Sequence, residues 1–398
     1  MPATGTGDGA QMTIQMLSAN HAAATATILA GTANRKGRGF GAGVYPITPQ
    51  TECIELLCAH EFEKGDVVRV ESEHSAMAAT MGFSLSGARS FTASSSNGLA
   101  YMTENIWAAA LFRLPIVMMA VNRTIGPPWN IWVDHGDTLM LRDTGWLQFY
   151  CKDNQEVLDT ILLCYRLSED SRVLLPSMVC QDAFVLSHTM MQSDIPDQEL
   201  VDRYLPIMEL PHRLAEKPVT FGGLDFPHET EAHRHRHHES MQRVPEVYEE
   251  CAAAFEEIFG RKQAGPLDPY RCDDAETLIV SMGTTASTAE QVVDRLREKG
   301  QKIGSLRLRM FRPFPETKLQ EAFAGRKRIA ILDRDISLGM GGVLWSECRG
   351  AAPKEALVQN YVIGLGGGDI RPENIEGCVE DLMKRDEVAE PQIVEVGA

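Results

Sequence analysis

The strongest constraint on the fold is an alternation of short apolar runs and helical stretches that begins near residue 43. The expected strands are 43–47, 67–70, 89–93 and 114–121, and the expected helices between them are 54–62, 75–85 and 98–111. Continuous apolar runs are typical of strands buried on both faces of a parallel sheet, and parallel strands need crossover connections that are usually helices. The sequence therefore predicts a doubly wound α/β domain, which a helix at 154–167 and a strand at 173–179 complete.

A second, smaller α/β domain follows after a change in the character of the chain. Residues 190–245 are rich in proline and poor in apolar runs, which predicts a linker or an arm that wraps over another surface. The alternation then resumes, with expected strands at 278–282, 303–310, 328–332 and 358–363. We therefore expect a first domain over 1–190, a linker or arm over 191–271, and a second domain over 272–398.

Composition excludes several classes of function. The chain has 398 residues, of which 38 are basic and 55 acidic, and its formal charge is −17. A negative field of this size repels nucleic acid and anionic lipid, so neither nucleic acid nor a membrane is an expected partner. The longest apolar run, 114–121, is too short to span a bilayer. The 9 cysteines are scattered along the chain, unlike a disulfide framework, which indicates a reducing compartment, and we expect the cytoplasm.

Three motifs that could hold a metal or a cofactor are better explained structurally. The motif GDG at 7–9, followed by Asn34, resembles a diphosphate and Mg²⁺ site, but no strand precedes it to aim the loop. Cys53 and Cys58 lie on an expected helix, where residues five apart point in different directions, so we interpret them as packed thiols. The histidines of 233–238 alternate with arginine in a polar segment and are expected to be solvated. No metal site is predicted on this chain.

A carboxylate cluster at a strand-helix junction allows two interpretations. Glu71, Glu73 and His74 follow the strand at 67–70 and begin the helix at 75–85. The carboxyl ends of parallel strands are where α/β sheets place chemistry, so the cluster suits a catalytic site. Acidic residues at this position also favour the helix dipole, so the cluster equally suits a helix cap. The residues alone leave both interpretations open.

Several segments together resemble a known family, the α subunits of pyruvate:ferredoxin oxidoreductases. The segments that carry the resemblance, in order, are YPITPQT at 45–51, VESEHSA at 70–76, GAR at 87–89, TASSSNGL at 92–99, NR at 122–123, DHGD at 134–137, RDTGW at 142–146, RMFRPFP at 309–315 and GLGG at 364–367. The resemblance covers nearly the whole chain, and YPITP and ESEHSA in this order are highly specific.

The resemblance implies a thiamine-diphosphate-dependent 2-oxoacid:acceptor oxidoreductase that is divided among several chains. The first domain would be the pyrimidine-binding domain, and the second a transketolase C-terminal-like α/β domain. A β subunit would hold the diphosphate and Mg²⁺, and further subunits of the γ and δ type, with their iron-sulfur clusters, would complete the enzyme. Coenzyme A would accept the acyl group, and a ferredoxin-like protein or a similar acceptor would accept the electrons.

The resemblance also assigns roles to individual residues. Glu73 would be the catalytic acid/base that shares a proton with the aminopyrimidine of the cofactor, which leaves Glu71 as a helix cap. Thr48 and Arg123 match the pair that binds the substrate carboxylate, and both follow expected strands. Asn97 would be a further contact to the cofactor.

The substrate stays open at this point. A pyruvate-like 2-oxo acid and an aryl 2-oxo acid such as phenylglyoxylate are close competitors, because the aromatic Trp129 follows Arg123 closely and could either line a substrate pocket or pack in the core. The run CQDAF at 180–184 departs from the family's more usual sequence. Two other classes are weaker alternatives: a thiamine enzyme without redox chemistry and a structural subunit whose cofactor pocket has decayed.

Overall fold

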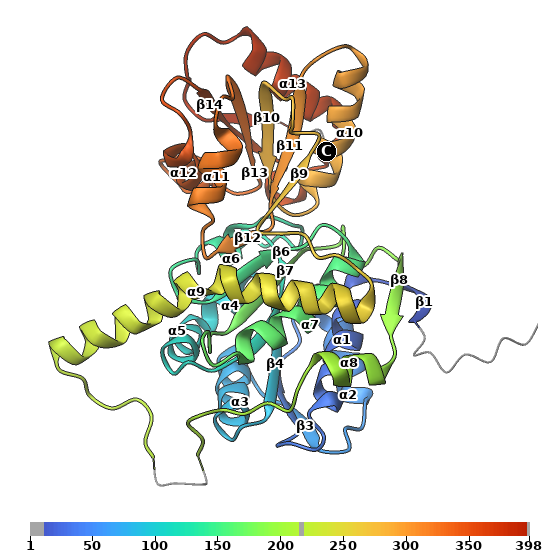
Figure 1. Cartoon of the computed structure of the whole chain (residues 1–398), viewed down its shortest axis with the longest axis vertical. Coiled ribbons are helices and arrows are strands. Elements are labelled where there is room, and N and C mark those ends of the chain that lie inside the picture. Colours follow the sequence, from blue (N-terminus) through green and yellow to red (C-terminus); the bar gives the residue numbers. More distant parts are fainter. Residues whose placement is uncertain (1–11, 215–218, 396–398) are drawn as a thin grey trace, which may run out of the picture.

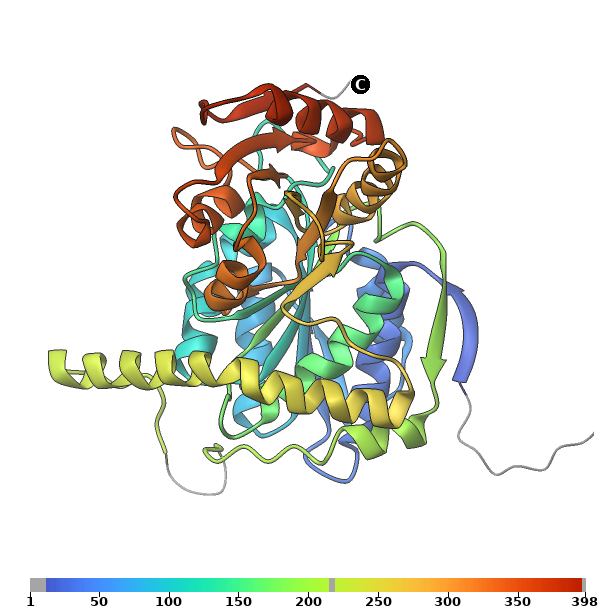
Figure 2. The same ribbon diagram turned by 45° about the horizontal axis from the view of Figure 1, so that its top comes forward.

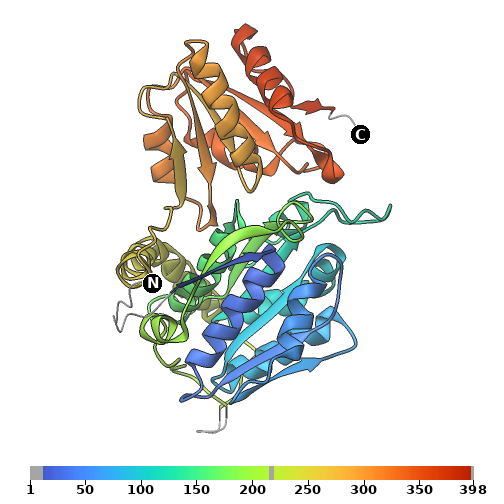
Figure 3. The ribbon, with the colours of Figure 1, turned by 90° about the vertical axis from the view of Figure 1, so that its right-hand side faces the viewer.

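The fold was examined in a computed structural model of the chain, which describes residues 12–214 and 219–395. The GDG motif at 7–9 lies outside the described residues. Two parallel-rich sheets dominate, and the domain built on the second sheet sits above the domain built on the first (Figure 1, Figure 3). The α/β class expected from the sequence is confirmed.

The first domain is built on a seven-stranded sheet. Its order is β12-β6-β7-β5-β4-β2-β3, and all neighbours are parallel except β12 and β6. The strands are β2 (Phe40–Val44), β3 (Gly65–Arg69), β4 (Arg89–Ser94), β5 (Ile116–Asn122), β6 (Leu147–Tyr150), β7 (Ser177–Asp182) and β12 (Met310–Arg312). The helices that connect them are α2 (Thr51–Ala59), α3 (Glu73–Leu85), α4 (Ser96–Tyr101), α5 (Thr103–Leu111), α6 (Gly136–Leu139) and α7 (Asn154–Glu169), and α1 (Ala19–Ala33) precedes the sheet.

Strand β5 shows why this sheet needs helices on both faces. All of its residues are buried, and successive side chains belong to different cores. Val117, Met119 and Val121 pack with α1, α2 and α7, whereas Ile116 and Met118 pack with α3, α4 and α5. Continuous apolar strands of this kind gave the α/β prediction.

Residues 191–271, which the sequence indicates as a linker or arm, have regular structure. Strand β8 (Met191–Pro196) pairs antiparallel with β1 (Met12–Leu17), and α8 (Gln198–Tyr204) follows it. The long helix α9 (Pro227–Phe259) lies across one face of the first domain, and its first turns project away from the body (Figure 1, Figure 2). Its buried residues from 237 to 259 recur every three or four positions and pack into the first core, so this helix is a layer of the first domain.

The second domain is built on a six-stranded sheet with the order β15-β14-β13-β10-β11-β9. The strands are β9 (Leu267–Tyr270), β10 (Thr277–Ser281), β11 (Ile303–Leu308), β13 (Arg328–Asp333), β14 (Leu357–Ile363) and β15 (Gln392–Val394). The helical segments are α10 (Thr285–Glu298), α11 (Glu316–Phe323), α12 (Val343–Cys348), η1 (Arg349–Ala351), η2 (Leu365–Gly367) and α13 (Pro372–Lys384).

Buried ion pairs hold the two domains together. The carboxylate of Glu156, at the start of α7, accepts hydrogen bonds from Arg307 of β11 (2.7 and 2.8 Å) and from Arg309 (2.6 Å), which directly precedes β12. The carboxylate of Asp182, at the end of β7, is hydrogen-bonded to His135 (2.8 Å), Arg334 (3.4 Å) and the backbone N–H of Thr284 (3.2 Å). We call these five charged residues, Glu156, Asp182, Arg307, Arg309 and Arg334, the domain junction.

The structure differs from the expected elements in three further places. The single helix expected over 98–111 is divided at Met102 into α4 and α5. Strands β1 and β6 are short and were not expected. Strand β12 leaves the second domain and pairs with β6, so it extends the first sheet. Among the described residues, no helix is long and apolar enough to cross a membrane.

Candidate active site at the strand ends

Three of the predicted site residues follow neighbouring strands of the first sheet. Thr48 follows β2, Asn97 is the second residue of α4 after β4, and Arg123 comes directly after β5. Because β5, β4 and β2 are adjacent and parallel, their carboxyl ends meet at one edge of the sheet. Together with Glu73, the first residue of α3, these residues form what we call the strand-end site.

Arg123 and Thr48 are in direct contact. The Arg123 Nη1 donates to the carbonyl oxygen of Thr48 at 2.8 Å, and its Nε donates to the carbonyl oxygen of Asn130 at 2.9 Å. The arginine is 8% exposed, whereas Thr48 is exposed. Within residues 12–214 and 219–395, no partner engages Nη2. The guanidinium is therefore fixed by two backbone groups and keeps an N–H for a ligand.

Glu73 lies against the start of α4. Gly98 permits this approach, because a Cβ atom at that position would lie 2.9 Å from Glu73 Oε1 and 2.4 Å from Ser94 Oγ. Glu73 is half-buried, and its carboxylate has no hydrogen-bond or ion-pair partner among the described residues. Half-buried carboxylates are normally paired, so this one is available to a ligand.

The neighbours of Glu73 do not share this placement. Glu71 is exposed and accepts a hydrogen bond from Ser75 Oγ at 2.8 Å, which lowers the pKa of Glu71. This contact matches the cap interpretation of Glu71. The His74 side chain lies 3.6 Å from exposed Glu104 of α5. Of the three residues that the sequence left open, Glu73 lies against the start of α4, whereas the ring of His74 lies 6.0 Å from that of Tyr101 at the end of α4.

Asn97 anchors the loop that follows Arg123. Its Nδ2 donates to the carbonyl oxygen of Gly126 at 3.0 Å, and its Oδ1 accepts from the Gly126 N–H at 3.1 Å. Trp129 in the same loop is 70% exposed, so its interpretation as core packing is wrong. The end of the loop is held by Trp132, whose ring centroid lies 4.5 Å from that of Phe184.

The sequence analysis did not single out Asp137, although it is fully buried beside this site. Its carboxylate accepts from the backbone N–H groups of Ser96 (2.9 Å) and Arg123 (3.0 Å) and from Asn122 Nδ2 (2.9 Å). Burial raises the pKa of Asp137 to about 7, although these donors oppose the rise. The DHGD segment at 134–137 was a sequence signal for this residue, but its contacts depend on tertiary structure.

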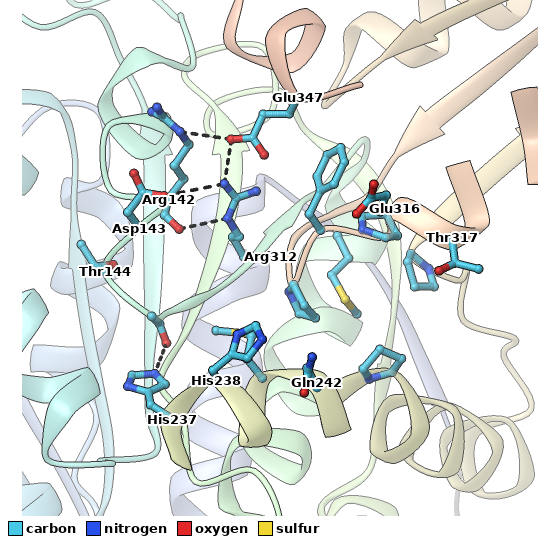
Figure 4. Close-up of a pocket in the computed structure, with 18 of the residues that line it drawn as sticks. Arg142, Asp143, Thr144, His237, His238, Gln242, Arg312, Glu316, Thr317 and Glu347 are labelled. Carbon is cyan, nitrogen blue, oxygen red and sulfur yellow. Dashed lines mark hydrogen bonds and ion pairs between the residues drawn. The ribbon is translucent and has the colours of Figure 1, made fainter. Parts of the chain in front are cut away.

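A cavity of about 840 Å³ lies elsewhere. It is lined by residues of the loop at 142–145, of α9 and of the segment 313–318 (Figure 4). Arg312 lies on its wall, 2.8 Å from Glu347 and 3.9 Å from Asp143. None of the four strand-end residues lines this cavity. The predicted site is thus an open edge of the sheet, not part of this cavity.

The metal-like motifs of the sequence take structural positions. Cys53 is buried in the first core, and half-buried Cys58 accepts a hydrogen bond from Arg69 Nε at 3.2 Å. The expectation that the histidine run is solvated is wrong for His237, which is 8% exposed and faces the carbonyl oxygen of Gly145 at 3.2 Å (Figure 4). Burial lowers the pKa of His237. In the part of the chain that the structure describes, no group of three or more metal-ligating side chains could hold an ion.

Comparison with known proteins finds two family models that match the chain. Residues 40–253 match a family model described as the thiamine-diphosphate-binding part of pyruvate flavodoxin/ferredoxin oxidoreductase, and residues 275–375 match one described as core domain II of pyruvate:ferredoxin oxidoreductase. The PorA subunit of pyruvate synthase from Methanothermobacter thermautotrophicus is 41% identical over 97% of this chain and 98% of its own.

Two more relatives widen the comparison. The VorA subunit of ketoisovalerate oxidoreductase from Pyrococcus abyssi is 40% identical over 93% of each chain. The solved structure of 2-oxoglutarate:ferredoxin oxidoreductase from Magnetococcus marinus superposes with a TM-score of 0.72 at 20% identity, covering 94% of this chain and 66% of that chain. This likeness concerns the fold alone.

Fold and sequence together define a thiamine-diphosphate-binding chain of the 2-oxoacid oxidoreductase class. The chain belongs to the pyruvate:ferredoxin oxidoreductase family, as an α-subunit-type member. The strand-end site fits the pyrimidine half of the cofactor, because Glu73 offers a carboxylate that has no partner among the described residues.

Proposed function

We propose that this chain is the α subunit of a thiamine-diphosphate-dependent enzyme that oxidatively decarboxylates a 2-oxo acid to an acyl-coenzyme A and carbon dioxide. The observation that carries the proposal is the Glu73 carboxylate, which has no partner among the described residues and lies at an edge of the sheet that also presents Arg123. When bound, thiamine diphosphate supplies the nucleophilic carbon and accepts the electron pair that decarboxylation releases. The electrons pass to ferredoxin or a similar acceptor.

The role proposed for Glu73 is to hold a proton. Its carboxyl group shares the proton with a ring nitrogen of the aminopyrimidine, which makes the exocyclic amine of that ring basic. The Asn97 amide already makes two hydrogen bonds to the backbone of Gly126. Its proposed contact to the cofactor would use the second N–H of Nδ2 or a further lone pair of Oδ1.

The role proposed for Arg123 and Thr48 is to bind the substrate carboxylate. Arg123 offers the free Nη2 and a positive charge, and Thr48 offers a hydroxyl on an exposed residue beside it. The two contacts from Arg123 to backbone oxygens fix the guanidinium before substrate arrives, which lowers the entropy cost of binding. Pyruvate-like acids need no more than this pair and a small pocket.

An aryl 2-oxo acid such as phenylglyoxylate is the second candidate substrate. Trp129 is 70% exposed and lies in the loop that Asn97 ties to the site, so an aromatic surface is available there. A bound aryl ring would stack on it.

The remaining parts of the enzyme are proposed to lie on other chains. A β subunit would hold the diphosphate and Mg²⁺, and subunits of the γ and δ type with iron-sulfur clusters would carry the electrons and bind coenzyme A. The loop at the strand-end site exposes Ile125 (38%), Trp129 (70%), Ile131 (39%) and Trp132 (50%), which supports coverage by a partner chain. The cytoplasmic location stays a prediction.

The test is a set of rates on the purified assembly. Reduction of an artificial electron acceptor with pyruvate, 2-oxoisovalerate, 2-oxoglutarate and phenylglyoxylate should show coenzyme-A-dependent turnover of one or more of these acids. Thiamine diphosphate and iron should co-purify with the assembly. An active assembly without iron would indicate a thiamine enzyme without redox chemistry, and an inactive one without thiamine diphosphate would indicate a structural subunit.

A further inference from the structure

Asp137 joins the two elements that carry the substrate and cofactor residues. Its Oδ2 accepts from the N–H of Arg123, at the end of β5, and from the N–H of Ser96, at the start of α4. Its Oδ1 accepts from Asn122 Nδ2. Neither backbone partner belongs to α6, the short helix on which Asp137 lies, so the carboxylate is not a local helix cap.

The backbone that Asp137 contacts is held in a conformation that needs support. Ser96 has φ +50°, in the left-handed region that non-glycine residues rarely adopt. A second contact, from Ser96 Oγ to the carbonyl oxygen of Thr124 at 2.6 Å, ties the same residue to the strand end of Arg123. Strained positions persist where surrounding contacts determine them, and they concentrate at functional sites.

The donors around Asp137 define what the side chain must offer. Three N–H groups point at it from Ser96, Arg123 and Asn122, and all three require an acceptor. A fully buried N–H that lost its acceptor would cost free energy and would move toward another partner. Loss of the carboxylate would therefore shift the end of β5 against the start of α4.

We infer that Asp137 is a positioning residue: its carboxylate fixes the strand end of Arg123 against the start of α4, where Glu73 and Asn97 make their contacts. The inference rests on the proposed function, because it assigns Asp137 an effect on substrate binding through Arg123. Asp137 itself is fully buried and touches neither substrate nor cofactor.

Two variants separate hydrogen bonding from charge. Asp137→Ala removes the acceptor and should raise the KM for the 2-oxo acid about tenfold or more, with a smaller change in kcat. Asp137→Asn keeps an acceptor for the two backbone groups, and Asn122 can turn its amide because its Oδ1 has no partner among the described residues. This variant should therefore stay within about threefold of the wild-type KM.

The decisive experiment is a double-mutant cycle with Arg123→Ala, measured on the purified assembly. If Asp137 acts through Arg123, Asp137→Ala should raise KM in the wild-type background and leave it nearly unchanged in the Arg123→Ala background. The matched control is Asp159→Asn, a buried carboxylate of α7 that accepts from Arg261 at 2.7 and 3.0 Å outside the site. It should lower the unfolding temperature without changing KM.

Three results would overturn the inference: a wild-type KM in assembled Asp137→Ala, a full additional rise in KM in the Arg123→Ala background, or equal losses in Asp137→Ala and Asp137→Asn. If Asp137→Ala does not assemble, Asp137→Ser, whose shorter side chain cannot reach both backbone N–H groups, takes its place, and a wild-type KM there overturns the inference. A wild-type assembly that turns over no 2-oxo acid contradicts the proposed function instead, so the two failures are distinguishable.

Discussion

Carboxylates are used in opposite ways in the strand-end site and the domain junction. At the junction, both oxygens of Glu156 accept hydrogen bonds from arginines of the second domain, and Asp182 accepts from His135 of its own domain through one oxygen and from the Thr284 N–H of the second domain through the other. At the strand-end site, the Glu73 carboxylate has no partner among the described residues. A paired buried carboxylate stabilises the fold, whereas an unpaired carboxylate beside an open surface is available for a ligand. Variants of the two groups should therefore fail in different ways.

The largest expected effect is on activity, from Glu73→Gln. The amide cannot exchange a proton with the cofactor's ring, so turnover of the 2-oxo acid should fall by about 10²- to 10⁴-fold. Since no described protein group pairs with Glu73, the unfolding temperature and the assembly should stay as in the wild type. Turnover rates and thermal unfolding measured on the same preparation check both expectations. A stable variant with normal turnover would refute the catalytic role of Glu73.

The opposite pattern is expected for Glu156→Gln at the domain junction. This change leaves Arg309 buried without a carboxylate partner and Arg307 paired with Asp268 alone, which should destabilise the chain by about 3–5 kcal/mol. Urea unfolding of the purified assembly measures the loss. Glu290→Gln, which removes a partly exposed pair with Lys152 nearby, is the matched control and should cost about 1 kcal/mol or less.

The Glu156 carboxylate also makes the stability of the domain junction depend on pH. Burial alone would raise the pKa of Glu156, but the charges and hydrogen bonds of Arg307 and Arg309 outweigh it and lower the pKa to about 2. A lowered folded pKa stabilises the protein above the unfolded value of about 4.3, and this contribution of about 3 kcal/mol is lost as the pH falls from about 4.3 to 2. The stability gap between wild type and Glu156→Gln should therefore narrow on acidification from pH 7. A constant gap in urea unfolding would contradict this.

A smaller effect is expected from Arg123→Ala. Loss of the charge-assisted contact should raise the KM for the 2-oxo acid by the equivalent of about 1.5–3 kcal/mol, with less effect on kcat. Arg123→Lys keeps the charge but not the planar geometry, so it should restore part of the affinity. An unchanged KM in Arg123→Ala would remove the residue from the substrate site.

The smallest effect is expected from Thr48→Val, which replaces the hydroxyl by a methyl group of similar size. Arg123 binds the backbone oxygen of Thr48, so the guanidinium should stay in place. The KM should rise by the equivalent of about 0.5–1.5 kcal/mol. A loss as large as that of Arg123→Ala would mean that the threonine does more than donate one hydrogen bond.

The sequence predicted the parts of the fold that depend on local pattern. The buried strands β2 and β5 are continuous apolar runs, so a parallel sheet and the edge at which Thr48 and Arg123 meet could be expected. Strand β4 is also fully buried, although most of its residues are polar. The family resemblance then supplied the roles of these residues, which stay predictions. The sequence alone could not tell which of Glu71 and Glu73 has the catalytic role, because Glu71 lies just before helix α3 and Glu73 begins it.

The features that the sequence did not predict depend on contacts between residues that are far apart in the chain. Asp137 depends on donors 14 and 41 residues away, and β12 joins the first sheet from beyond the second domain's first strands. Helix α9 is polar over its first turns, and its buried stripe begins only at His237, so proline and histidine content indicated a linker. Tertiary packing supports this helix only from His237 onward, because its first turns project away from the body.

The most direct test of the account is the structure of the assembled enzyme with thiamine diphosphate and Mg²⁺ bound. The account predicts that a Glu73 carboxylate oxygen lies about 2.6–3.2 Å from a ring nitrogen of the aminopyrimidine, with Arg123 facing the substrate position and the diphosphate held by another chain. A cofactor whose pyrimidine meets a different carboxylate, or one bound away from the strand-end site, would contradict it.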